Sequence, residues 1–274
     1  MTTPPSMPPP PQYPGAQTPG DTSLPENANV ELEVDGPTRQ RRLTVFFRGL
    51  LLIPQYVVLF FLGIANLLVM FVGWFGALAM GRLPEWARQY LALYLRYSTR
   101  VNAYAYLLVD RYPSFSLEGD DYPVRLDMHS GRLNRAAVLF RFLLIIPAAI
   151  VSVVLSTGWL VCGFVLWLVV LIMGRTPAPV FGATASMLRY SVRQSAYFAM
   201  LTSAYPNPKS IFGERVVDSD QQEVPRGTRP LVLTRGAVAL LIVFLVLGVL
   251  GQAADTAVQA TMPPPEYQAA GLGG

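Results

Sequence analysis

Three apolar stretches dominate the pattern of hydrophobic and polar positions along this chain. They run from Gly49 to Met80, from Phe142 to Met173 and from Ala237 to Gly251, and no Asp, Glu, Lys, Arg or His interrupts them. Apolar runs of roughly 18 residues or more are typical of membrane helices. The pattern therefore predicts an all-α integral membrane protein, in which the third, shorter run is a C-terminal transmembrane helix.

The first two stretches belong to an internal repeat. Residues 42–113 align without a gap on residues 135–206, and 30 of the 72 pairs are identical. Each copy closes its apolar stretch with Gly-Arg-x-Pro, at 81–84 and at 174–177. The repeat divides the chain into a Pro-rich disordered tail at 1–28, repeat 1 at 29–118, repeat 2 at 119–212, a linker with the C-terminal helix at 213–252, and a second disordered tail at 253–274.

Each long stretch admits two arrangements. A single helix of 32 residues would be about 48 Å long, whereas the hydrocarbon core of a membrane is about 30 Å thick. A helical hairpin would instead turn at 63–66 in the first copy and at 156–159 in the second. Arginines flank both ends of both stretches, and hairpins would keep all of them on the cytoplasmic side. We therefore predict two hairpins, one final crossing and a cytoplasmic N-terminus, with one long helix per repeat as the alternative.

Short polar segments complete each copy. Residues 30–34 and 124–128 alternate between apolar and charged side chains, which predicts two β-strands that could pair with each other. An amphipathic helix rich in Tyr and Arg is expected after each Gly-Arg-x-Pro, at the depth of the lipid headgroups. In the second copy Pro179 predicts a later start for this helix.

Repeated arginines are the candidate functional residues. Two pairs sit one helical turn apart in the amphipathic helices and could clamp a lipid phosphate, while two further arginines precede the prolines of the apolar stretches and could reach lipid phosphate or backbone carbonyls. The simpler interpretation is that all of them anchor their helices at the membrane surface. These candidate contacts to lipid headgroups or to a partner are Arg48, Arg96, Arg100, Arg141, Arg189 and Arg193.

Composition narrows the function further. The chain is 52% hydrophobic and 14% charged with a net charge of +4, and it has no separate basic patch that would suit nucleic acid. Its single cysteine, Cys162, and single histidine, His129, predict neither a disulfide nor a metal site. No nucleophile–base pair recurs between the copies, so we expect no catalytic residues, no cofactor and no enzymatic activity.

Several motifs together resemble a known family. Arg-x-Leu-Leu-x-Ile-Pro at 48–54, Gly-Arg-x-Pro at 81–84, Leu-Arg-Tyr-Ser-x-Arg-Val-Asn-Ala-Tyr at 95–104 and Asp-Arg-Tyr-Pro-Ser-Phe-Ser-Leu at 110–117 are similar to the actinobacterial membrane proteins grouped as domain of unknown function 4389 (DUF4389). The resemblance covers about residues 29–206, and therefore both copies. It implies a multi-pass protein of the bacterial cell membrane without an established activity. Family members often carry His after Ile-Pro, where this chain has Gln55 and Ala148.

Two functions remain open at this point. The first is a non-enzymatic scaffold or accessory subunit, which would contact the bilayer with its anionic headgroups and a membrane protein partner. The alternative is a small transport or lipid-handling protein that uses the repeated arginines, since internal repeats enclose the pathway in many transporters.

Overall fold

A computed structural model describes residues 30–37, 39–116, 122–128, 133–212, 215–217 and 232–261. The α-helices are α1 (Arg42–Phe46), α2 (Arg48–Met80), α3 (Glu85–Ala105), α4 (Arg135–Leu139), α5 (Arg141–Leu144), α6 (Ile146–Met173), α7 (Ala178–Phe198) and α8 (Arg235–Thr261). A 3-10 helix, η1 (Pro208–Phe212), and the strands β1 (Val30–Val34), β2 (Val124–Met128), β3 (Arg215–Val217) and β4 (Val232–Thr234) complete the described elements. The tail predicted at 1–28 lies outside the described residues. The tail predicted from 253 is wrong in its first part, because α8 continues to Thr261.

The apolar stretches form long helices, so the predicted hairpins are wrong. Helix α2 is continuous over 33 residues, and in repeat 2 only a one-residue break at Ile145 separates α5 from α6. The small residues at the expected turns serve packing instead, since Gly63 faces the Tyr94 hydroxyl and Gly158 faces the backbone of α8. Pro54, near the start of α2, removes one backbone hydrogen bond without ending the helix, and no proline stands at the middle of either stretch to start a turn. Residues 48–80, 141–173 and 235–259 are each long and apolar enough to cross a membrane.

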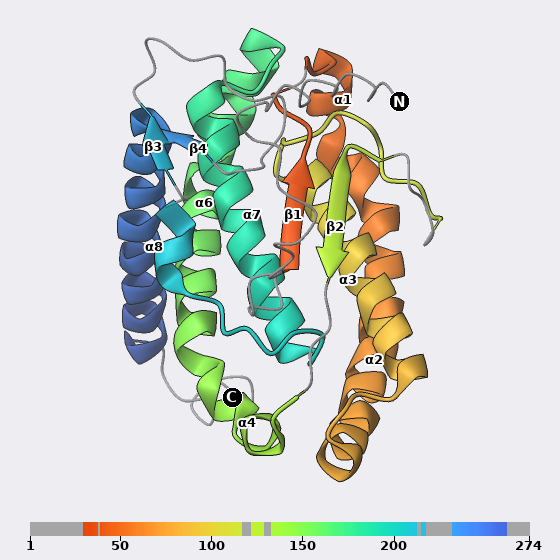
Figure 1. Cartoon of the computed structure of the whole chain (residues 1–274). Coiled ribbons are helices and arrows are strands. Elements are labelled where there is room, and N and C mark those ends of the chain that lie inside the picture. Colours follow the sequence, from red (N-terminus) through yellow and green to blue (C-terminus); the bar gives the residue numbers. More distant parts are fainter. Residues whose placement is uncertain are drawn as a thin grey trace, which may run out of the picture.

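The two repeats lie side by side in opposite directions. The indole nitrogen of Trp74, near the end of α2, donates to the Val138 carbonyl at the start of repeat 2, at 3.1 Å. Its counterpart Trp167, near the end of α6, donates to the Val45 carbonyl at the start of repeat 1, at 2.8 Å. Each repeat therefore begins where the apolar helix of the other ends, as Figure 1 shows for α2 and α6. The copies form an inverted pair related by an approximate two-fold axis.

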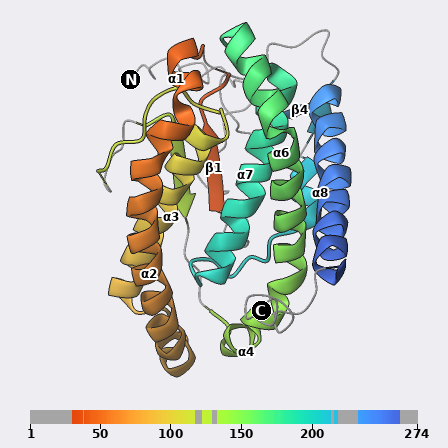
Figure 2. The ribbon, with the colours of Figure 1, turned by 180° about the vertical axis from the view of Figure 1, so that it is seen from behind.

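The strands pair at the centre of this inverted arrangement. β1 and β2 are antiparallel as predicted, with Leu32 opposite Leu126 in the middle of the pair. Val30, Leu32 and Val34 are buried, and the core that they join includes residues of α3 and α7. Figure 1 places the two strands in front, and Figure 2 shows α2 and α6 on the opposite side. The molecule thus has three layers, with α3 and α7 between the strands and the apolar helices.

Helices α3 and α7 start alike. Gly81 and Gly174 end the preceding helices in the left-handed conformation, with φ of 70° and 65°, as the Gly-Arg-x-Pro motif predicts. Helix α7 begins at Ala178, the counterpart of Glu85, so its predicted late start is wrong. Pro179 fits the first turn because the N–H that it lacks would have no partner inside the helix there.

The C-terminal segment, which consists of η1, β4 and α8, breaks the symmetry because it covers repeat 2 alone. Helix α8 packs against α6 so closely that a Cβ atom on Gly158 would overlap the Phe244 carbonyl, and one on Gly248 would overlap the Val154 carbonyl. The same segment also contacts α7 through η1, β4 and α8. Among the described residues, repeat 1 has no counterpart of these elements, so no helix covers the surface of α3 that is equivalent to the one they cover on α7.

Candidate functional site

Two of the six candidate arginines are internal structural residues. The Arg48 guanidinium is 3% exposed, donates to the Tyr104 carbonyl at 2.8 Å, lies 4.4 Å from the centre of the Tyr104 ring and pairs with Asp110 at 3.6 Å. Arg141 repeats the arrangement with the Tyr197 carbonyl at 2.5 Å and the Tyr197 ring at 4.3 Å. Each arginine joins the start of an apolar helix to the end of the next amphipathic helix. In this structure neither guanidinium is placed to contact a lipid headgroup.

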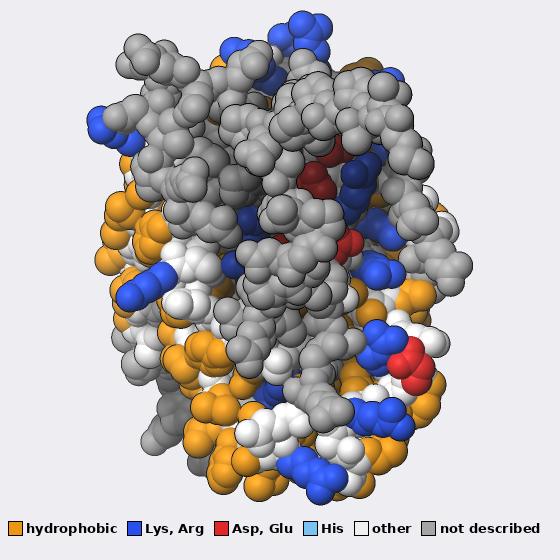
Figure 3. All heavy atoms as spheres, viewed as in Figure 1, with side chains coloured by type: hydrophobic (Ala, Val, Ile, Leu, Met, Phe, Trp, Pro, Cys, Tyr) orange, Lys and Arg blue, Asp and Glu red, His pale blue; other side chains and the backbone are white. Residues whose placement is uncertain are grey.

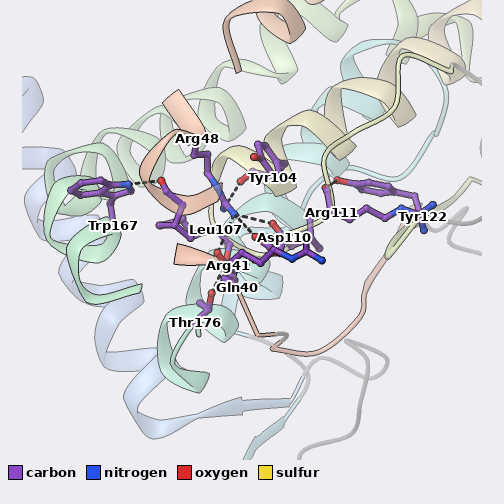
Figure 4. Close-up of polar contacts among 12 residues, drawn as sticks. Gln40, Arg41, Arg48, Tyr104, Leu107, Asp110, Arg111, Tyr122, Trp167 and Thr176 are labelled. Atoms are coloured by element: carbon purple, nitrogen blue, oxygen red, sulfur yellow. Dashed lines mark hydrogen bonds and ion pairs between the residues drawn. The ribbon is translucent and has the colours of Figure 1, made fainter. Parts of the chain in front are cut away.

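Figure 4 shows the network around Arg48. Gln40 accepts a hydrogen bond from Arg48 at 3.1 Å and donates to the Thr176 hydroxyl at 2.7 Å, and Thr176 in turn donates to the Leu107 carbonyl at 2.7 Å. These contacts join the start of repeat 1, the end of α3 and the start of α7. The cluster holds the two repeats together at one end of the molecule. Sequence reasoning missed Gln40 and Thr176, because neither side chain recurs in the other repeat.

The arginine pair of repeat 2 holds a strand. Arg189 donates to the Leu32 carbonyl at 2.9 Å, and Arg193 donates to the Val30 carbonyl at 3.2 Å. Both acceptors belong to β1, at the start of repeat 1. These two arginines therefore hold β1 of repeat 1 against α7, which is a structural role.

The equivalent pair of repeat 1 is arranged differently. Arg100, the counterpart of Arg193, is buried and donates to the Ser116 carbonyl at 3.2 Å. The side chain of Arg96, the counterpart of Arg189, is exposed and makes no hydrogen bond or ion pair in the described part of the chain. Two arginines with identical Leu-Arg-Tyr-Ser neighbours, at 96 and at 189, thus have different surroundings.

Arg96 and Arg100 line a cavity of about 1040 Å³ between α3 and β2, here called the α3–β2 groove. Its lining consists of Trp86, Arg88, Gln89, Tyr90, Ala92, Leu93, Arg96, Thr99 and Arg100 from α3, and Val124, Arg125, Leu126 and Asp127 from β2. Figure 3 shows arginine side chains on the right of the strand-bearing face, in the region of α3 and β2. Four arginines and one aspartate give the lining an excess of positive charge.

The groove exists where the C-terminal segment has no counterpart. In repeat 2, Gly236 at the start of α8 packs against Pro179, and the Ser186 hydroxyl donates to the Ile211 carbonyl of η1. The repeat-1 counterparts of Pro179, Gly182 and Ser186 are Trp86, Gln89 and Leu93, all of which line the groove. The same surface is therefore filled by protein in repeat 2 and open in repeat 1.

The arginines of the groove differ in whether their side chains have hydrogen-bond partners. Arg88 is bound by Glu85, with its Nε 2.9 Å from the carboxylate, and this hydrogen bond holds the pKa of Glu85 below its usual range. The side chain of Arg125 is exposed and, like that of Arg96, makes no hydrogen bond or ion pair among the described residues. Arg88 and Arg125 were not sequence candidates. The alternation of β2 could have indicated Arg125, because it places Arg125 and Asp127 on one face of the strand.

The fold and its apolar surface define a helical membrane protein built from two inverted copies of one module, with a cationic groove beside the first copy. A family described as "Domain of unknown function (DUF4389)" matches the chain at residues 42–116 and again at 135–210, and the chain belongs to this family. No curated protein and no solved structure matches it. The resemblance seen in the sequence is thus confirmed for both copies.

Proposed function

We propose that this chain is a lipid-handling protein of the bacterial cell membrane, and that the α3–β2 groove binds phosphate-bearing lipid headgroups. Guanidinium groups match phosphate oxygens with paired hydrogen bonds, and they keep their charge at every physiological pH. The groove lining contains four of them and one carboxylate, and two of the four, Arg96 and Arg125, are exposed. Its lining has no nucleophile–base pair, which favours binding over catalysis for this site. The plasma membrane and a cytoplasmic N-terminus stay predictions.

The difference between Arg96 and Arg189 carries the proposal. If the repeated arginines only supported the fold, the two counterparts would be expected to make the same contacts. Arg189 is buried on a carbonyl of β1, whereas Arg96 is exposed beside a groove that also holds the exposed Arg125. A pure scaffold, the other function that the sequence suggests, does not require this cationic groove.

Two double variants of the full chain test the proposal. Arg96→Gln with Arg125→Gln removes the two exposed charges of the groove. Arg82→Gln with Arg175→Gln is the matched control, since it removes the same charge from two exposed arginines that are not in the groove lining. Exposed ionic contacts contribute about 0.2–1 kcal/mol each, so losing two of about 0.7 kcal/mol weakens binding roughly tenfold.

Native mass spectrometry in detergent gives the measurement, with phosphatidylglycerol as the anionic lipid and phosphatidylcholine for comparison. The apparent Kd for phosphatidylglycerol should rise about tenfold in the groove variant and change less than about twofold in the control. Equal weakening in both variants would assign the binding to general surface charge. An unchanged Kd in the groove variant would leave the scaffold function as the better account.

A further inference from the structure

The exposed apolar surface of each repeat is longer than a membrane is thick. Exposed hydrophobic side chains follow α2 from Leu50 to Met80 and continue past its start through Leu43, Phe46 and Phe47. The 33 residues of α2 alone measure about 50 Å at 1.5 Å per residue. To fit the roughly 30 Å hydrocarbon core, α2 would have to tilt by roughly 50°, beyond the range of about 0–40° seen for membrane helices.

Charged side chains lie halfway along the helices. The approximate two-fold axis passes between Leu32 and Leu126, and on either side of it the strand pair places Glu31 opposite Asp127 and Glu33 opposite Arg125. Figure 3 shows arginine and acidic side chains on this face at several heights between the two ends of the molecule. If α2 and α6 crossed the membrane, these charges would lie at the depth of the bilayer midplane, where ionised groups are most costly.

Arginines also lie at both ends of the bundle. Gly174, at the end of α6, is next to Arg42, and Gly81, at the end of α2, is next to Arg135. Because the repeats are inverted, these two clusters are at opposite ends of the long helices. Crossing helices would place one cluster on each side of the membrane, against the preference of arginine for the cytoplasmic side.

We infer that α2, α6 and α8 lie in the plane of the membrane, with their exposed faces in the acyl chains of one leaflet. The apolar face is then covered by lipid, and neither a second copy of the chain nor a partner protein is needed to cover it. This orientation puts α3 and α7 at the depth of the headgroups, the strand pair toward water, and both arginine clusters on one side. The inference rests on helix length and charge placement and is independent of the proposed function.

Cysteine labelling tests the orientation in the full chain. In a Cys162→Ala background, Arg82→Cys and Arg175→Cys place one exposed thiol at each end of the bundle. A membrane-impermeant maleimide is added to right-side-out and to inverted membrane vesicles, and labelling is read as a mass shift. Both thiols should react from the same side, with a preference of about tenfold or more over the other side.

Labelling of the two positions from opposite sides would overturn the inference, as would thiols that react only after detergent is added. Arg41→Cys and Ser203→Cys, exposed near the same two ends, repeat the test if a first variant fails to fold. An endogenous membrane protein of known orientation calibrates the sidedness of the vesicles. Labelling of all four positions from one side, whichever side it is, supports the inference.

Discussion

Replacing Gly158 by leucine should detach the C-terminal helix from repeat 2. Helices α6 and α8 touch through their backbones at Gly158 and Gly248. A Cβ atom at either glycine would lie well inside the 3.0 Å limit that real Cβ contacts essentially never pass. At Gly158 the opposing atom is the Phe244 carbonyl oxygen, which cannot rotate away as a flexible side chain can. A larger residue at this position therefore has to push α8 outward.

The loss of folding stability follows from the side-chain packing that this shift disturbs. Phe244 and Leu241 of α8 are completely buried, and their packing against repeat 2 loosens as the two helices separate. Inserting extra methylene groups into a packed core costs about 1–3 kcal/mol. In a protein of roughly 200 folded residues, each kcal/mol lowers the Tm by about 2–4 °C. Gly158→Leu should thus lower the Tm by about 4–8 °C for a cost of about 2 kcal/mol.

Gly163→Leu is the matched control on the same helix. A Cβ atom there would meet only the Trp159 ring, at 3.6 Å, which is an ordinary contact. Thermal unfolding of both variants, followed by circular dichroism in the same detergent, gives the two Tm values. If Gly158→Leu and Gly163→Leu melt at the same temperature, the close approach of α6 and α8 is wrong, and so is the account of why only repeat 1 has a groove.

Two further predictions concern single side chains. Arg141→Met removes the donor to the buried Thr202 carbonyl and one of the two donors to the Tyr197 carbonyl, which keeps the N–H of Met200. We expect a loss of about 1–3 kcal/mol, seen as a lower Tm that Arg141→Lys does not restore, and an unchanged Tm would contradict this structural role. Glu85 has a lowered pKa because Arg88 donates to its carboxylate, so the pair is intact above that pKa and is lost as the pH falls through it. Arg88 is thereby released at acidic pH, and the chain should then bind phosphatidylglycerol more tightly. Glu85→Gln should bind this lipid about two- to threefold more tightly than the unchanged chain at neutral pH, and its affinity should no longer depend on this titration. Equal pH profiles for the two proteins would refute the release of Arg88.

Local pattern was enough to predict several elements. Alternation of apolar and charged residues gave the strands at 30–34 and 124–128 with their observed bounds, and Gly-Arg-x-Pro gave the helix ends at Gly81 and Gly174. These features depend on residues close together in the chain. The hairpins were predicted from a charge argument that assumed a helix must either cross the membrane or turn back within it.

The inverted arrangement could not be derived from the repeat. Identical copies can be placed in parallel or in opposite directions, and the contacts that decide between these, such as Trp74 with Val138, join residues 64 positions apart. The candidate arginines likewise show that local sequence does not predict contacts between distant parts of the chain. Arg96 and Arg189 share their local sequence, and they differ in a contact made far along the chain, because Arg189 donates to the Leu32 carbonyl 157 positions away whereas the Arg96 side chain has no such acceptor among the described residues.

Photo-crosslinking tests most directly the claim that repeat 1 alone binds lipid headgroups. The full chain is reconstituted with a phosphatidylglycerol carrying a photoreactive group on its headgroup, irradiated and digested, and the modified peptides are mapped by mass spectrometry. We expect modification within residues 86–100 and 124–127, and its loss in the Arg96→Gln, Arg125→Gln variant. Equal modification of the equivalent segment of α7, residues 179–193, would contradict the account, because that surface is filled by η1, β4 and α8.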